Sequence, residues 1–113
     1  MYDFNLNNDE EIRLIYDNVK INIGVDWIEY TCIVTNKRLL FLDYPNAINN
    51  SMEDLRISGK INYIRKKEIV TEVYLSDIEK VVNENDDYKI ILKNKQYIIM
   101  DSYVVIELLK KYL

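Results

Sequence analysis

The sequence contains no histidine, and this absence excludes much of enzyme chemistry. Histidine is the usual general base near neutral pH, the usual activator of a nucleophile and a common zinc ligand. The one cysteine, Cys32, lies between β-branched residues, where we expect a buried and inert thiol. Neither an EF-hand calcium loop nor a glycine-rich phosphate loop is present. We therefore expect a protein that is not an enzyme and that uses no cofactor or metal.

Flexible and membrane-spanning segments are also missing. Only two glycines and one proline occur in 113 residues, so long flexible linkers are not expected. No apolar run approaches the roughly 20 residues of a transmembrane helix, and the acidic start is unlike a signal peptide. One cysteine excludes an intramolecular disulfide and is typical of a reducing compartment. We expect one soluble, cytoplasmic domain that covers residues 1–113.

Positive charge is scarce, because 15 Lys and Arg face 19 Asp and Glu, for a net charge of -4. An acidic protein is repelled by nucleic acid and by anionic lipid unless basic residues gather locally. The densest basic group is Lys60, Arg65, Lys66 and Lys67. Such charges contribute roughly 1 kcal/mol each at an anionic membrane. Membrane binding thus stays open as an alternative, whereas nucleic acid is not expected, since the aromatic residues are not interleaved with a basic groove.

What the sequence does contain is a period of two in apolar residues, which is typical of half-buried strands. It predicts about seven antiparallel strands, in residues 11–24, 27–34, 39–42, 68–75, 78–82, 88–93 and 96–100. Asp17 and Asn18 indicate a bend or bulge inside the first of them. Residues 1–10 are expected to form an N-terminal arm, either partly ordered or with a short helix that starts near Asn8.

The densest apolar run, residues 30–45, is predicted to be a hairpin with a tight turn at residues 35–38. Asn36 is the residue there that most readily adopts a left-handed backbone. Both faces of the strand after the turn are apolar, so we expect a helix or a second sheet to cover the hairpin. Arg38 has three possible roles: a solvated charge in the turn, an ion pair with a nearby carboxylate across the hairpin, or ligand binding.

The period changes to 3.6 after Ser102, which predicts a C-terminal helix with an apolar face. That face comprises Val105, Ile106, Leu109, Tyr112 and Leu113, and Asp101 or Ser102 is expected to cap the helix. Residues 46–67 are read as an inserted segment, for which a short helix is favoured and a strand is the alternative. One buried core is expected to contain Leu39, Phe41, Ile91 and Leu109.

The segments DNVKINIG (residues 17–24), CIVTNKRLLFLD (32–43), EVYLSDIEKV (72–81) and YKIILKNKQYIIM (88–100) precede the predicted helix. In this order they resemble the bacterial pleckstrin-homology-like and GRAM-like domain family, from about residue 10 to the end. The resemblance implies a mainly β fold, in which a split barrel of two nearly orthogonal sheets is capped by one helix. The fold hosts unrelated functions, so it does not define the activity.

Family members that bind phosphoinositides carry Lys and Arg in the loop between the first two strands. Here that loop, residues 24–27, contains Asp26 and no basic residue, so this lipid site does not transfer. Trp27 could cap the barrel end or anchor a partner. We expect a non-catalytic module for protein–protein interaction or self-assembly through strand edges, with binding of anionic lipid headgroups as the alternative. The candidate interaction residues are Trp27, Arg38, Lys60, Arg65, Lys66 and Lys67.

Overall fold

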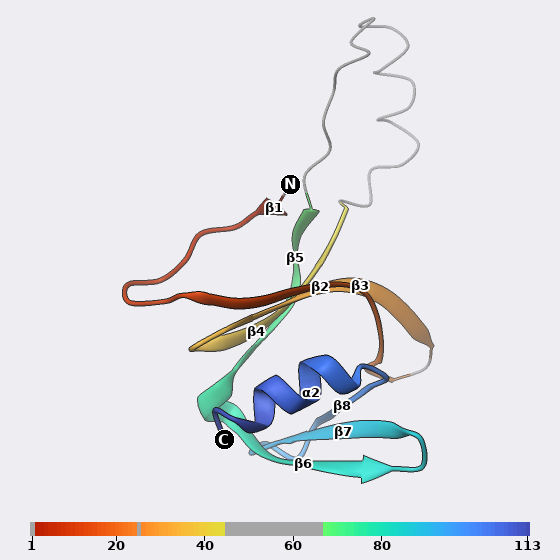
Figure 1. Cartoon of the computed structure of the whole chain (residues 1–113). Coiled ribbons are helices and arrows are strands. Elements are labelled where there is room, and N and C mark those ends of the chain that lie inside the picture. The colour runs from red at the N-terminus through yellow and green to blue at the C-terminus, as the bar shows by residue number, and fades with distance from the viewer. Residues whose placement is uncertain (1, 25, 45–66) are drawn as a thin grey trace, which may run out of the picture.

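The structure of this chain is a computed structural model that describes residues 2–24, 26–44 and 67–113 (Figure 1). These residues form eight strands: β1 (Tyr2–Asp3), β2 (Ile12–Asn22), β3 (Trp27–Thr35), β4 (Arg38–Asp43), β5 (Lys67–Tyr74), β6 (Ile78–Glu84), β7 (Asp87–Leu92) and β8 (Tyr97–Met100). They also form a 3-10 turn, η1 (Leu75–Asp77), and one α-helix, α2 (Tyr103–Lys110). The predicted mainly β fold with a C-terminal helix is confirmed.

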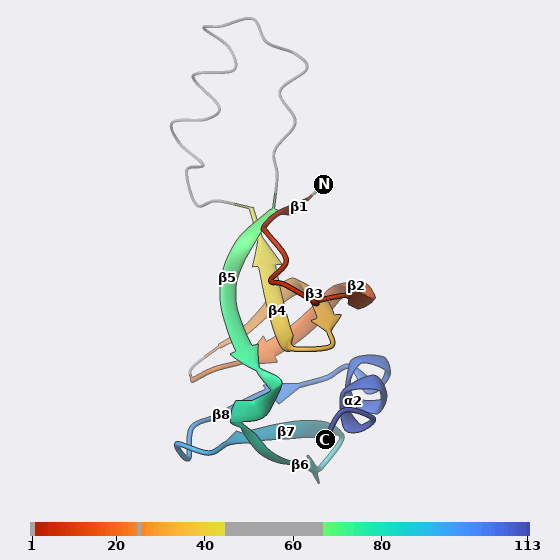
Figure 2. The ribbon, with the colours of Figure 1, turned by 90° about the vertical axis from the view of Figure 1, so that its left-hand side faces the viewer.

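The strands form one open sheet in the order β1-β5-β4-β3-β2-β8-β7-β6, so β1 and β6 are its two ends. All neighbours pair antiparallel except β1 and β5, which pair parallel. The long strand β2 pairs with β8 only at Ile21 and Asn22. The sheet therefore splits there into one half of β2–β5 and another of β6–β8, with α2 at the level between them (Figures 1 and 2).

The predicted bend in β2 is present. The register with β3 shifts between Tyr16 and Val19, and Asn18 has a φ of 61°. An asparagine tolerates this left-handed conformation better than most residues, because its short polar side chain can bond locally. The extra residues twist β2, and the twist lets one strand belong to both halves of the sheet.

The inner faces of both halves pack on one apolar cluster, together with Val105, Ile106 and Leu109 of α2. Leu39 and Phe41 lie in this cluster, as predicted. The prediction for Ile91 is wrong: its neighbour Ile90 is fully buried in the cluster, whereas Ile91 is half-buried and outside it. Because two isoleucines are adjacent in β7, the period of two does not choose between them. Pairing of Ile90 with Ile98 of β8 decides which one faces inward.

A second, smaller cluster lies on the outer face of the β2–β5 half. Ile33, Leu40 and Leu42 are fully buried there, and Tyr2, Phe4 and Ile69 pack against them. The expected cover was a helix or a second sheet, but on this face the N-terminal arm supplies it. The short helix considered near Asn8 is also wrong, since residues 4–11 contain one turn at residues 8–9 and no helix.

The turn between β3 and β4 is shorter than predicted, because only Asn36 and Lys37 lie outside the strands. Asn36 is not among the described non-glycine residues with positive φ, which are Asp9, Asn18, Asn85 and Lys95. The left-handed prediction for Asn36 is therefore wrong. Its amide instead ties the arm to the hairpin: Oδ1 accepts from Glu11 N at 2.7 Å and Nδ2 donates to Asp9 O at 2.9 Å.

The C-terminal helix is capped by Ser102, whose Oγ accepts from Val105 N at 3.3 Å. Asp101, the other candidate cap, accepts from Lys20 N at 3.0 Å and so joins β2. The apolar face ends earlier than predicted, because Tyr112 and Leu113 lie beyond α2 and are exposed. The inserted segment predicted at residues 46–67 falls outside the described residues, apart from Lys67, which begins β5.

Candidate functional site

The edge of β5 is the first candidate surface. One side of β5 pairs with β4 from Glu68 to Tyr74. On the other side β1 pairs only with Lys67 and Glu68. Within the described part of the chain, residues 69–74 have no strand on this outer side. Figure 2 shows β5 as the marginal ribbon of its half, with β1 beside one end of it. Unpaired backbone groups on such an edge are a template for another strand.

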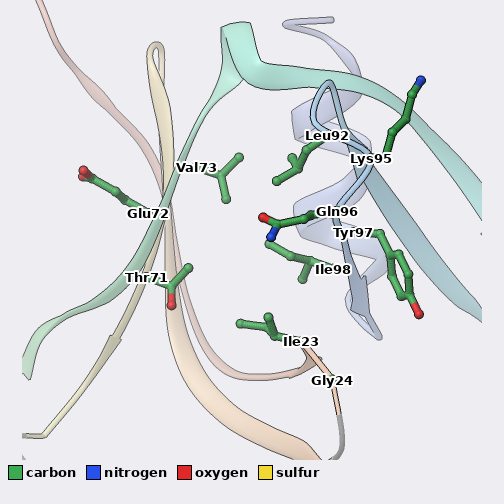
Figure 3. Close-up of a pocket in the computed structure, with 10 residues that line it drawn as sticks. All are labelled: Ile23, Gly24, Thr71, Glu72, Val73, Leu92, Lys95, Gln96, Tyr97 and Ile98. Carbon is green, nitrogen blue, oxygen red and sulfur yellow. The ribbon is translucent and has the colours of Figure 1, made fainter.

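A cavity of about 400 Å³ lies between β5 and the hairpin of β7 and β8 (Figure 3). Val73 of β5 and Leu92 of β7 point toward one another from its two walls, and Ile98 of β8 points into it. Thr71 and Gln96 add polar groups to the lining. Glu72, Lys95 and Tyr97 also line the cavity, so its apolar walls alternate with polar and charged groups.

The cavity exists because β2 and β8 separate after their two-residue pairing. Ile23 and Gly24 continue beyond β2 and line the far end of the cavity. Gly24 leaves room there, since a Cβ at this position would meet no atom within 4 Å. The alternating pattern of the sequence predicted the strands on both walls but contained no signal for this separation.

The opposite edge of the sheet, β6, is better protected than β5. Its charged residues are Glu79, Lys80 and Glu84. A register shift near Glu79 adds a bulge, and Lys95 Nζ lies 3.2 Å from Glu79 Oε2. Charges and bulges on an edge are the known defences against strand addition. The pairing of β5 with β4 also contains a register shift, between Phe41 and Leu42, so both edges have a bulge. The difference lies in charge: the open stretch of β5 contains only Glu72, so β5 is the more receptive edge.

Arg38 is the centre of a buried ion-pair network. Its side chain is 6% exposed, and that of Glu10 is fully buried. Arg38 Nε and Nη2 donate to the two carboxylate oxygens of Glu10 at 2.8 and 3.0 Å, and Nη1 donates to Glu72 at 2.8 Å. Nη2 also donates to Asn5 O at 2.6 Å. Of the three roles considered, an ion pair with a carboxylate is confirmed, but its partners lie in the arm and in β5 and not across the hairpin. The solvated turn is wrong.

The network sets the protonation of its members. Burial raises the pKa of Glu10, but hydrogen bonds from Arg38, Thr35 and the Asn7 backbone outweigh it and lower the pKa from 4.5 to about 2. The hydrogen bond to Glu10 raises the pKa of Arg38 despite burial. Both groups therefore stay charged and paired, and Arg38 holds the arm in place. The sequence contained no signal for this pair, since Glu10 lies in the polar arm.

Of the remaining candidate residues, the structure describes Lys67 and Trp27. Lys67 Nζ donates to Thr31 Oγ1 at 2.7 Å and lies 3.7 Å from Asp17. Lys60, Arg65 and Lys66, the other members of the basic group, fall outside the described residues. Trp27 is 44% exposed and belongs to neither apolar cluster, so it does not cap the core.

Trp27 instead lies at one end of a row on the outer face of the sheet. Residues opposite one another on paired strands share a face. The register gives the row Val82, Lys89, Ile99, Asn22 and Trp27, across β6, β7, β8, β2 and β3. Lys89 Nζ also lies 4.1 Å from the centroid of the Tyr97 ring on this face. The sequence signal was the adjacent apolar pairs in β7 and β8, which make both faces apolar.

The described residues contain little that points to catalysis. Cys32 is fully buried, and burial raises the pKa of its thiol, so the predicted inert thiol is confirmed. In the described ranges, no group of three or more His, Cys, Asp or Glu could hold a metal ion. Among the same residues there is no helix with the length and apolar character to cross a membrane.

Comparisons with known proteins were made for the whole chain. No family model matches it, and no curated protein matches it either.

Proposed function

We propose that this chain is a non-catalytic binding module that accepts an extended segment of another protein as an added strand on β5. The observation that carries this proposal is the open edge of residues 69–74 beside a cavity with both apolar and polar lining residues. In strand addition, main-chain hydrogen bonds provide affinity, and alternate side chains of the ligand enter pockets that provide specificity. The cavity between Val73 and Leu92 is suited to receive such a side chain.

The proposal includes the pleckstrin-homology-like and GRAM-like resemblance. Without β1, the strand order is β5-β4-β3-β2-β8-β7-β6, a meander in two halves that is followed by one helix. This order supports the split-barrel fold that the resemblance implies. Because that fold hosts unrelated functions, it does not select the ligand, and the choice of a protein segment rests on the β5 edge.

Binding of anionic lipid headgroups has less support. A headgroup needs several donors that converge on it. Lys67 is engaged by Thr31 and Asp17, and the loop between β2 and β3 contains Asp26 and no basic residue. The lipid alternative is therefore an outcome that the test must be able to detect.

The test begins with phage-displayed random peptides selected on the purified protein. We expect selected peptides with alternating apolar residues, and amide chemical shifts that change at residues 69–74 when they bind. Val70 is exposed on β5, so Val70→Lys introduces an edge charge without opening the core. We expect Val70→Lys to weaken peptide binding at least tenfold, whereas the matched Val82→Lys on β6 leaves it unchanged.

Three outcomes would overturn the proposal. The first is a failure to select any peptide, and the second is equal weakening by Val70→Lys and Val82→Lys. The third is pelleting with phosphoinositide vesicles that falls steeply with salt, which would favour the lipid alternative. Gly24→Trp gives an independent check, since this side chain has space beside the cavity and should obstruct it.

A further inference from the structure

The N-terminal arm is bound by parts of the chain that lie far away in the sequence. β1 pairs with the start of β5, and Tyr2 and Phe4 pack on the outer apolar cluster. Arg38 donates to Asn5 O, and Lys37 Nζ donates to Asn8 O. Among the described residues, these partners of the arm all belong to β3, β4, β5 and the turn between β3 and β4. Within one chain, a single turn links the arm to that surface.

That turn, residues 7–10, is a natural hinge. Glu10 N donates to Asn7 O at 3.2 Å, and Asn7 N donates to the Glu10 carboxylate at 2.8 Å. Asp9 has a φ of 59°, a left-handed conformation that aspartate tolerates better than most residues but that glycine adopts at lower cost. Directly after the turn, Glu10 is fixed to Arg38. The chain is therefore anchored on one side of the hinge and left-handed at its centre.

We infer that two copies of this chain associate by exchange of their arms, so that residues 2–8 of each copy lie on β4 and β5 of the other. Opening the turn releases the left-handed conformation of Asp9 and breaks the two hydrogen bonds between Asn7 and Glu10. Every other bond of the arm forms again between the copies, because both surfaces are identical. The exchange gives a two-fold symmetric dimer that adds no further copies. Each arm makes the same contacts with the other copy that it makes within a single chain.

This inference rests on the proposed function in one respect, namely that β5 accepts an added strand. It uses a different stretch of that strand, since the arm occupies Lys67 and Glu68 and leaves residues 69–74 open. Arm exchange and peptide binding can therefore be measured separately on the same protein.

The test is a mixed disulfide. Tyr2 and Lys67 are opposite one another in the register of β1 and β5. One variant carries Tyr2→Cys and a second carries Lys67→Cys, and the buried native thiol of Cys32 does not compete. The two variants are mixed at high concentration, equilibrated and oxidised. We expect a covalent heterodimer, and none when Lys80→Cys on β6 replaces Lys67→Cys as the matched control.

The hinge supplies a second test, measured by sedimentation equilibrium. Asp9→Gly lowers the cost of the left-handed conformation in the closed turn, so we expect the dimer to dissociate about tenfold more readily. Asn85→Gly is the matched control, because Asn85 has a similar φ of 58° in the β6–β7 turn, which is not a hinge. Deletion of Asn8 and Asp9 shortens the turn and is expected to shift the protein toward the dimer.

The inference is overturned if the double variant Tyr2→Cys/Lys67→Cys forms its internal disulfide while the mixed variants give no heterodimer above the control. An equal effect of Asp9→Gly and Asn85→Gly on dissociation would contradict it as well. Neither result bears on the β5 edge, because peptide selection and Val70→Lys test that site separately. Conversely, a heterodimer without any peptide binding supports arm exchange and rejects the edge site.

Discussion

The helix α2 and the N-terminal arm cover the two apolar clusters by different chemistry. From α2, Val105, Ile106 and Leu109 are fully buried in the larger cluster. From the arm, Tyr2 and Phe4 are only partly buried against the smaller one. Apolar burial is non-directional and needs no charge. The helix is therefore part of the core, whereas the arm is a cover that needs further attachment.

That attachment is the ion pair of Glu10 and Arg38, together with the amide of Asn36. Charged hydrogen bonds are directional, and they depend on protonation. We expect acid, or exchange of the arm between two copies, to remove such a cover while α2 keeps the larger cluster closed. We therefore expect α2 to contribute to the global stability of the fold, whereas the arm covers the smaller cluster only while its ion pair is intact.

The largest expected effect comes from removal of a whole cover. Deletion of residues 105–113 exposes the larger cluster and should abolish cooperative unfolding in urea, as followed by tryptophan fluorescence and circular dichroism. Deletion of residues 1–8 opens only the smaller cluster, so a cooperative transition at lower urea should remain. If the chain without residues 105–113 unfolds as sharply as the intact chain, α2 is not part of the core.

Single truncations in the two clusters come next. Phe41→Ala removes a fully buried ring from the larger cluster and should cost about 3–5 kcal/mol of unfolding free energy. Leu40→Ala, equally buried in the smaller cluster, should cost about 2 kcal/mol, near the lower limit for such changes, because the arm can close over the cavity. Urea denaturation measures both. Equal costs would mean that the two covers pack equally tightly.

The sequence was sufficient to predict most elements, because alternation and turn residues are local signals. Asp17 and Asn18 indicated the bulge in β2, and the change of period after Ser102 indicated α2. It was not sufficient for the direction of Ile90 and Ile91, since both residues are apolar and the choice depends on pairing with β8. Period alone therefore predicts a strand but does not predict its facing when both faces are apolar.

The candidate site was harder to predict, because it depends on residues far apart in the sequence. Arg38 follows a turn, where a solvated charge is the usual outcome, and its burial depends on Glu10 and Glu72. The cavity beside Val73 depends on where β2 and β8 separate. Neither feature has a local signal. The sequence favoured strand edges as the binding surface, but it did not distinguish the β5 edge from the β6 edge.

Acid should loosen the arm before it affects the helix. The pKa of Glu10 is about 2 in the folded chain, below its ordinary value of 4.5. A lowered pKa means that the unfolded chain binds the proton more readily. The stability from Glu10 is thus complete above about pH 4.5 and is lost as pH falls toward 2. The shift corresponds to about 3 kcal/mol.

The measurement is urea denaturation from pH 5 to pH 2 in the intact chain and in Glu10→Gln. We expect the variant to be less stable at pH 5 and to lose less further stability on acidification. The difference between the two proteins should shrink as pH falls. Parallel pH profiles would show that Glu10 is not the group that links the arm to pH.

The smallest expected effect concerns the cap of α2. Ser102 accepts from Val105 N, so Ser102→Ala leaves that donor without its side-chain partner and should cost about 1 kcal/mol. Ser102→Thr should recover most of the loss, because its hydroxyl can make the same bond. Since the cap involves no titrating group, this cost should not change between pH 5 and pH 2. In the double variant Ser102→Ala/Glu10→Gln, the two costs should add to within about 0.5 kcal/mol if the covers act independently. A larger deviation would mean that the arm and the helix are coupled through the core between them.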